Sequence, residues 1–223
     1  MTKHLSIDNT NILDVSAEVL GHGGIIVYPT DTLYGFGVDA RNKDAIDKIN
    51  KIKKRNSPMS VIAADFEQLL SWTLISDVET DLVKENIGDK TTFILPAIEG
   101  IIHGSILAPD NTIGIRIPTH PFGPDLVAKI GYPITSSSVN RHGEKPLNNP
   151  AMIIQEFGEE NLGTKILQAA RDKPDKQFVF IHAVEPTKDY ERATGQKSKT
   201  KLPFHSCHVC EEDKMVVRRG GYN

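Results

Sequence analysis

Hydrophobic and polar positions follow two different periods along the chain. Over residues 9–21, apolar side chains recur every three or four positions until a glycine-rich segment ends the pattern, which predicts a helix. Residues 24–28 then form a short β-branched run that stops at Pro29, as a buried strand does. A second helix is predicted to begin after Asn42, a residue that can cap it, because alanine and isoleucine repeat there at helical spacing.

The remaining sequence continues this alternation of helical and strand-like segments. Strands are predicted at 59–63, 92–97, 112–117, 134–138, 178–184 and 215–217, and helices at 65–72, 77–86, 121–130 and 149–171. Interleaved helices and strands are typical of the α/β class. Residues 186–203 are rich in lysine, threonine and glycine, and we expect them to form a solvated loop.

Composition and charge narrow the class of protein. The chain has 223 residues, of which 39% are apolar and 25% charged, and its formal net charge is −3. This composition indicates a globular protein, and the charge balance gives no overall attraction for nucleic acid. No apolar run is long enough to span a membrane or to form a signal peptide. We therefore expect one soluble, cytoplasmic domain without a membrane partner.

Polar and basic side chains gather after two of the predicted elements. Residues 28–37 read Y-P-T-D-T-L-Y-G-F-G and follow a buried strand, where α/β proteins commonly bind ligands. The alternative for this segment is an ordinary polar turn. Residues 51–55 read K-I-K-K-R at a helix end, where the helix dipole favours cations in any case. The functional alternative is a clamp for phosphate or carboxylate, with Arg55 as a planar fork and Lys53 as a point charge.

Two further segments carry candidate binding groups. Residues 133–140 run from a strand into four consecutive hydroxyl residues and Asn140, which can bind phosphate or ribose oxygens without adding charge. Such runs also occur as edge strands and caps. Arg116 lies in an otherwise apolar strand, so it must meet either an internal carboxylate or a bound anion.

Metal binding has weaker support in the sequence. Cys207 and Cys210 form a Cys-x-x-Cys with His205 and His208 nearby, but a structural zinc site needs four ligands, usually from two separated pairs. The chain has no second cysteine pair. We therefore predict no metal site held by the protein.

Taken in order, these segments resemble the threonylcarbamoyl-AMP synthase family, the Sua5/YrdC/YciO superfamily. The shared motifs are P-T-[DE]-T-x-Y-G at 29–35, K-x-R at 53–55 and R-x-P-x-H-P at 116–121. The family's T-S-T-S-A-N is matched by T-S-S-S-V-N at 135–140. The resemblance covers about residues 10–157. It implies a YrdC-like α/β fold, with a twisted, mostly mixed β-sheet and flanking helices around a concave anion-binding cleft, in one domain over residues 1–223.

The chain departs from the family pattern in its last third and at one internal motif. Residues 158–223 diverge, and the family's S-T-[IV]-[VI]-D and L-R-x-G have their nearest matches at 206–210 and 217–220. The family's W-P-G-P is replaced by residues 86–91.

The resemblance implies a reaction and a set of site residues. The family combines L-threonine, bicarbonate and ATP into threonylcarbamoyl-AMP and pyrophosphate, for N6-threonylcarbamoylation of adenosine 37 in tRNA. Lys53 and Arg55 would be the catalytic cations that bind carbamate, threonine and phosphates, and Thr30 and Tyr34 would line the threonine pocket. Mg²⁺ is expected with ATP, held by ATP and water. The implied nucleotide ligands are Arg116, Ser136, Ser138, Asn140, Ser206 and Arg218.

Two alternatives stay open at this point. A YciO-like paralogue with weak or no synthase activity would bind the phosphates of tRNA or double-stranded RNA. Its basic stripe would consist of Lys43, Lys48, Lys51, Lys53, Lys54 and Arg55. Carbamoyl transfer to another acceptor ranks last, because no fused acceptor domain is evident. The resemblance also implies partner proteins of a tRNA-modifying assembly.

Overall fold

A computed structural model of the chain describes residues 2–6, 10–88, 90–157, 178–182, 205–209 and 216–219. The strands are β1 (Thr2–Ser6), β2 (Ile26–Pro29), β3 (Tyr34–Gly37), β4 (Ser60–Ile62), β5 (Thr91–Pro96), β6 (Thr112–Arg116), β7 (Ile134–Ser138), β8 (Phe178–His182), β9 (His205–Val209) and β10 (Val216–Arg219). The helices are α1 (Ile12–Gly21), α2 (Lys43–Lys53), α3 (Phe66–Trp72), α4 (Asp77–Glu85), α5 (Phe122–Ile130) and α6 (Pro150–Phe157), with a 3₁₀ turn η1 (Gly104–Ile106).

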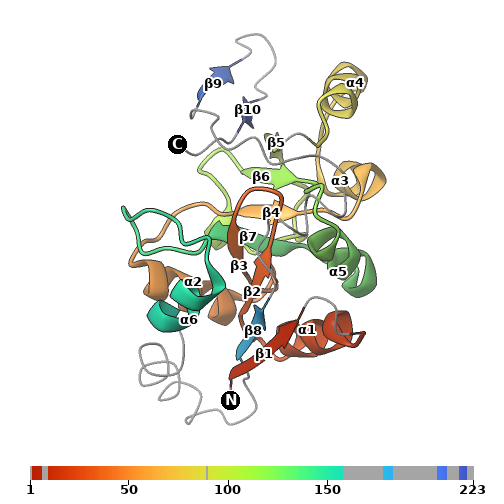
Figure 1. The fold of residues 1–223 in the computed structure, drawn as a ribbon. Helices are drawn as coiled ribbons and strands as arrows, with labels where there is room; N and C mark the ends of the chain where they lie inside the picture. Colours follow the sequence, from red (N-terminus) through yellow and green to blue (C-terminus); the bar gives the residue numbers. More distant parts are fainter. Residues whose placement is uncertain are drawn as a thin grey trace.

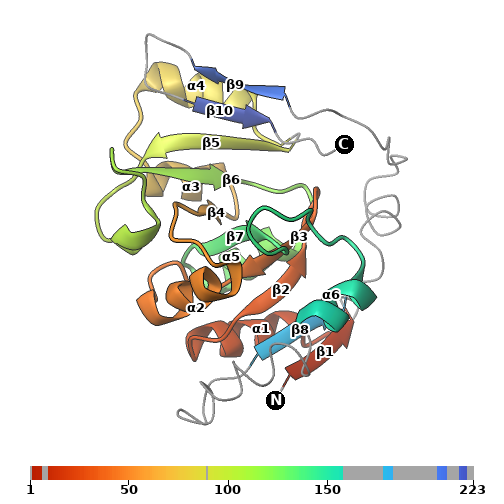
Figure 2. The ribbon, with the colours of Figure 1, turned by 90° about the vertical axis from the view of Figure 1, so that its left-hand side faces the viewer.

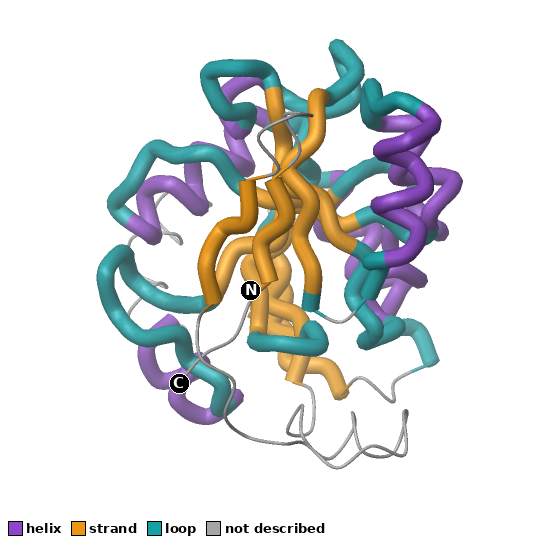
Figure 3. The backbone as a smooth tube through the Cα atoms, turned by 90° about the horizontal axis from the view of Figure 1, so that it is seen from above, coloured by secondary structure: helices purple, strands orange, loops and turns teal. Residues whose placement is uncertain are grey.

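The strands of the described residues form one mixed sheet. Their order is β1-β8-β2-β3-β7-β4-β6-β5-β10-β9, which Figure 2 shows from β1 and β8 at one end to β9 and β10 at the other. The pairs β1–β8, β2–β8 and β4–β6 are parallel and the other pairs antiparallel. Helices lie on both sides of the sheet (Figures 1 and 3). The predicted α/β class with a mixed, helix-flanked sheet is therefore confirmed.

One face of the central sheet is a continuous apolar core. Strand register places Val61 of β4 opposite Ile115 of β6, and Ile115 opposite Phe93 of β5. All three side chains are buried. Residues opposite each other in a sheet point to the same face, so this face is closed to solvent.

The other face is divided between an apolar end and a polar end. At the apolar end, α5 packs so closely that a side chain at Gly123 would touch Ile62 and Tyr28. At the polar end, neighbouring strands carry small or hydroxyl side chains that are only half-buried. These are Ser136 of β7, Ser60 of β4 and Gly114 of β6. The polar end of this face is therefore less completely buried than its apolar end.

Most of the predicted elements are found within one to three residues of their predicted ends. Asn42 caps α2 as expected, its side chain accepting a hydrogen bond from the Ala45 N–H at 3.1 Å. The strands β1, β3 and β9 were missed by the sequence analysis. The predicted helix at 149–171 is described only as α6, and its remainder and the expected loop at 186–203 lie outside the described residues. Among the described segments, no helix is long and apolar enough to cross a membrane.

The close packing of β2 against β3 predicts that Gly37 cannot be replaced without a loss of stability. A Cβ on Gly37 would lie 2.7 Å from Tyr28 Cε1 and 3.1 Å from Ile26 Cγ1, both in the core. We expect Gly37→Ala to lower the free energy of unfolding by about 2 kcal/mol, because a rigid ring must move. The measurement is urea unfolding followed by circular dichroism.

Gly21 provides the matched control for this substitution. It is the last residue of α1, and a Cβ there would have no neighbour within 4 Å. Gly21→Ala should leave stability unchanged or raise it by about 0.5 kcal/mol, since alanine is the better helix former. Equal effects of the two substitutions would contradict the close packing at Gly37.

Candidate anion-binding site

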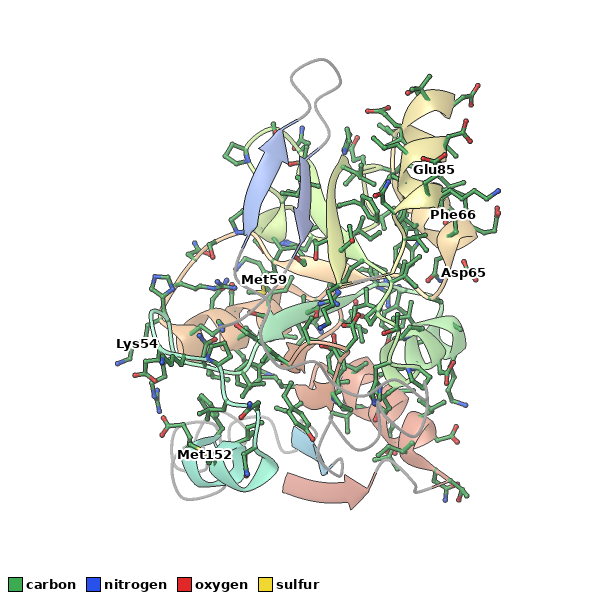
Figure 4. The ribbon with its side chains drawn as sticks, turned by 45° about the horizontal axis from the view of Figure 1, so that its top comes forward. Lys54, Met59, Asp65, Phe66, Glu85 and Met152 are labelled. Carbon is green, nitrogen blue, oxygen red and sulfur yellow. The ribbon has the colours of Figure 1, made fainter. Side chains whose placement is uncertain are left out.

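The end of α2 sets the directions of two basic side chains. Lys54 follows the helix in the left-handed conformation (φ 50°, ψ 42°), and its side chain points outward (Figure 4). The Lys54 N–H donates to Lys51 O at 3.3 Å and the Arg55 N–H donates to Asn50 O at 3.1 Å, which together form a Schellman motif. The chain therefore reverses between Lys53 and Arg55, so both can face β7.

Lys53 is buried against the end of β7. Only 2% of its surface is exposed, and Nζ donates to Ser138 O and to Asn140 Oδ1, each at 2.5 Å, and to Asn140 O at 3.2 Å. Asn140 Oδ1 also accepts from Ser138 Oγ at 2.8 Å, and its Nδ2 donates to Glu144 O at 2.6 Å. Burial, with a smaller contribution from the nearby Arg55 charge, lowers the pKa of Lys53 to about 8.

Arg55 is half-buried and lightly held. Its Nη2 donates to Ser137 Oγ at 3.0 Å, while Nε is buried without a hydrogen-bond partner among the described residues. Burial lowers the pKa of this guanidinium as well. Within the described part of the chain, neither Arg55 nor Lys53 has a carboxylate within ion-pair distance. Two neighbouring cations that lack a counter-charge form a site that an anion would stabilise.

Arg116, in contrast, meets an internal carboxylate. Its Nη2 donates to Asp31 Oδ1, and its Nη1 donates to Thr32 Oγ1 at 3.3 Å. The two charged side chains are 10% and 1% exposed, so this is a buried ion pair. Asp31 Oδ2 also accepts from the Thr119 N–H at 3.3 Å. Arg116 therefore ties the turn after β2 to the segment after β6.

The turn that Arg116 holds also contains Thr30. The Thr30 hydroxyl donates to Leu33 O at 2.7 Å and accepts from the N–H groups of Thr32 and Leu33, each at 3.2 Å. Thr30 and Tyr34 are 4% and 1% exposed, and Tyr34 O accepts from the Val139 N–H at 3.1 Å. The Thr30 hydroxyl thus shapes this turn, and Tyr34 joins it to the chain that follows β7.

The structure brings most of the candidate residues into one region but leaves two apart. Residues 30–34, 53–55 and 136–140 meet around the ends of β3 and β7. Ser206 lies in β9 and Arg218 in β10, where Arg218 is paired with Thr92 of β5. Four strand spacings separate β10 from β7, about 19 Å along the sheet. The structure describes the backbone of these two residues only.

The lysines of the expected RNA-binding stripe do not form a continuous exposed row. Lys43 pairs with Asp47 at 2.6 Å, and Lys48 donates to Gly23 O at 2.9 Å. Lys53 faces the interior, as described above. Lys51 and Lys54 are exposed.

Three residues near the basic pair were missed or undervalued by the sequence analysis. Ser137 is the partner of Arg55, and Asp31 is the partner of Arg116. Asn50 is a buried amide three residues before Lys53. A polar residue on the apolar stripe of a predicted helix was the available signal for Asn50.

Potential metal ligands are not clustered in the described part of the chain. It contains no group of three or more histidine, cysteine, aspartate or glutamate side chains that could hold a metal ion. Cys207 lies in β9, and Cys210 of the Cys-x-x-Cys segment lies outside the described residues.

Sequence comparison finds relatives about 30% identical to this chain. A threonylcarbamoyl-AMP synthase of Idiomarina loihiensis is 32% identical over 141 residues, which cover 61% of this chain and 75% of the relative. A threonylcarbamoyl-AMP synthase of Vibrio campbellii is 30% identical over 159 residues, covering 69% and 83%. An uncharacterized protein of Haemophilus influenzae is 30% identical over 138 residues, covering 61% and 67%.

Solved structures with the same fold have lower sequence identity. The crystal structure of E. coli YciO has a TM-score of 0.67 at 24% identity and covers 83% of this chain and 84% of that one. P. abyssi Sua5 complexed with L-threonine has a TM-score of 0.64 at 18% identity, covering 88% and 62%. The Sua5/YciO/YrdC family model, described as telomere recombination, matches residues 18–172, more than half of the chain. On this match, the chain belongs to the Sua5/YciO/YrdC family.

Proposed function

We propose that the chain is an L-threonylcarbamoyladenylate synthase, a nucleotidyltransferase that forms threonylcarbamoyl-AMP and pyrophosphate from L-threonine, bicarbonate and ATP. The observation that carries this proposal is the pair of Lys53 and Arg55, which has no carboxylate partner among the described residues. Relatives about 30% identical are named threonylcarbamoyl-AMP synthase, and they support it. A Sua5 complexed with L-threonine has the same fold.

The proposed reaction brings two anions together. The amine of threonine adds to CO₂ derived from bicarbonate and becomes a carbamate after losing a proton. A carbamate oxygen then attacks the α-phosphorus of ATP, and pyrophosphate leaves with the electrons of the broken P–O bond. Because carbamate and triphosphate repel each other, the reaction needs fixed cations more than an acid–base pair. Arg55 and Lys53 supply two such cations.

The remaining candidate residues divide between the two substrates. Ser136, Ser138 and Asn140 are the proposed nucleotide ligands near the cations, and Ser206 and Arg218 are proposed from the family resemblance alone. Thr30 and Tyr34 belong to the proposed threonine side, where the hydroxyl of Thr30 acts through the shape of its turn. The Asp31 carboxylate compensates the charge of Arg116, so we assign Arg116 mainly to holding this turn.

Mg²⁺ is the proposed companion of ATP. The described residues hold no cluster of metal ligands, and the Asp31 carboxylate near the site is occupied by Arg116. These residues fit an ion held by phosphate and water rather than by a protein cage. When bound, Mg²⁺ would offset part of the triphosphate charge. We further propose that tRNA accepts the threonylcarbamoyl group of the product, and that the protein acts in the cytoplasm.

The proposed function predicts which lysine is needed for activity. In the presence of threonine and bicarbonate, the chain should release pyrophosphate from ATP. Lys53→Ala and Arg55→Ala should each lower this rate by about 100-fold or more, because each removes a cation from the transition state. Lys51→Ala, which removes an exposed lysine from the same helix, should retain the rate within about twofold. Absence of threonine-dependent release by the native chain would rule out the synthase.

The pKa of Lys53 predicts a pH dependence for ATP binding. A lysine with a pKa of about 8 carries its charge below that pH and loses it above. Binding of an anion needs the charged form, so the affinity for ATP should fall as the pH rises from 7 to 9, by about three- to tenfold. Isothermal titration calorimetry measures this. In Lys53→Arg the guanidinium does not titrate in this range, so the profile should flatten, and a flat profile in the native chain would contradict the assignment.

The buried Arg116–Asp31 pair predicts a loss of stability. Asp31→Asn leaves Arg116 buried without its counter-charge and should lower the free energy of unfolding by about 3 kcal/mol. Asp47→Asn removes one partner of an exposed pair with Lys43 and should cost about 0.5 kcal/mol or less. Urea unfolding of both variants measures the difference. Similar costs for the two would show that Arg116 has another counter-charge.

A further inference from the structure

Asn50 is a polar residue in an apolar setting. It lies on the inner face of α2, where its buried neighbours in sequence are Ile46, Ile49 and Ile52, and it is 9% exposed. Burying an amide is unfavourable unless its groups are hydrogen-bonded, and its Oδ1 has no partner among the described residues. Leucine would suit this position better for packing alone. The amide therefore needs an explanation outside the core.

Asn50 contacts Arg55 and the residue after it. The Asn50 main-chain oxygen accepts from the Arg55 N–H at 3.1 Å, and its Nδ2 donates to Asn56 Oδ1 at 3.2 Å. Lys54, just before Arg55, is held in the left-handed conformation, which is unfavourable for a residue with a Cβ. The side-chain bond between Asn50 and Asn56 thus fastens the turn just beyond the point where the Schellman motif ends.

Arg55 depends on this turn because its own side chain is weakly fixed. Its guanidinium donates a single hydrogen bond to the described residues, to Ser137 Oγ, and no carboxylate holds it. Lys53, by comparison, is fixed by three acceptor oxygens. The direction of Arg55 is consequently set by its main chain.

We propose that Asn50 is a positioning residue of the anion site, which fastens the turn over residues 54–56 so that Arg55 faces β7. The inference deepens the proposed function and rests on Arg55 being a cation of that site. Asn50 acts through Arg55, since its amide bonds to the turn rather than to β7. A substitution of Asn50 should therefore matter only while Arg55 is present.

A double-substitution cycle tests this dependence. The probe is inorganic pyrophosphate, whose binding to the full chain is measured by isothermal titration calorimetry. Asn50→Leu should weaken binding by about five- to tenfold, and Asn56→Ala by about two- to threefold, because a loosened turn leaves the guanidinium less well oriented. In the Arg55→Ala background, Asn50→Leu should change the affinity by less than about twofold. Equal losses in both backgrounds, or unchanged binding in Asn50→Leu, would overturn the proposal.

Controls separate positioning from folding. Asn86 also ends a helix, and its Nδ2 donates to Leu82 O at 2.9 Å, so Asn86→Ala removes a comparable bond far from Arg55 in the sequence. It should leave pyrophosphate affinity unchanged. If thermal unfolding shows that Asn50→Leu does not fold, the same cycle is carried out with Asn56→Ala and Arg55→Ala. Asn56 is exposed, so its substitution leaves the core unchanged.

The titration and the pyrophosphate-release assay together distinguish failure of the proposed synthase activity from failure of the proposed role of Asn50. A chain that binds pyrophosphate but releases none from ATP would overturn only the synthase. A native chain that binds no pyrophosphate would overturn the anion site, and the role of Asn50 with it.

Discussion

The ammonium group of Lys53 joins the two halves of the site. Its three acceptor oxygens belong to the chain at and just beyond the end of β7, while its main chain ends α2. Because the ammonium group donates all of these hydrogen bonds, it holds the end of α2 at a fixed distance from the end of β7. Lys53 and Ser138 are 85 residues apart in sequence. That attachment holds the side chain of Asn140 and keeps the end of α2 beside β7, where Arg55 contacts Ser137.

The two arginines near the site are both at least partly buried, but they have different partners. Arg116 is buried together with Asp31, so its charge is compensated and its contribution is to the fold. Arg55 is less buried, and among the described residues its guanidinium bonds only to the Ser137 hydroxyl. Its charge therefore remains available to a bound anion. Counter-charge, rather than exposure alone, distinguishes the arginine that supports a site from the one that can bind a ligand.

Local signals were sufficient for most of the described helices, and they marked Lys53 and Arg55 as candidate residues. Asn42 caps α2 because its side chain bonds to a residue three positions ahead, which a sequence pattern can contain. The strand β3 was missed because two of its four residues are glycine and its second partner, β7, lies about a hundred residues later. The pairing of Asp31 with Arg116 also lacks a local signal, because the two residues are 85 positions apart in sequence.

The strand order also bears on how the chain is made. Among the described strands, β1 pairs only with β8, and β8 separates it from β2. A ribosome must therefore release Phe178 before Thr2 has a neighbour, while α1 and most of the sheet can already fold. During that interval the open edge of β2 is exposed to pairing with other chains. Newly made protein would be most prone to aggregation at its earliest strands.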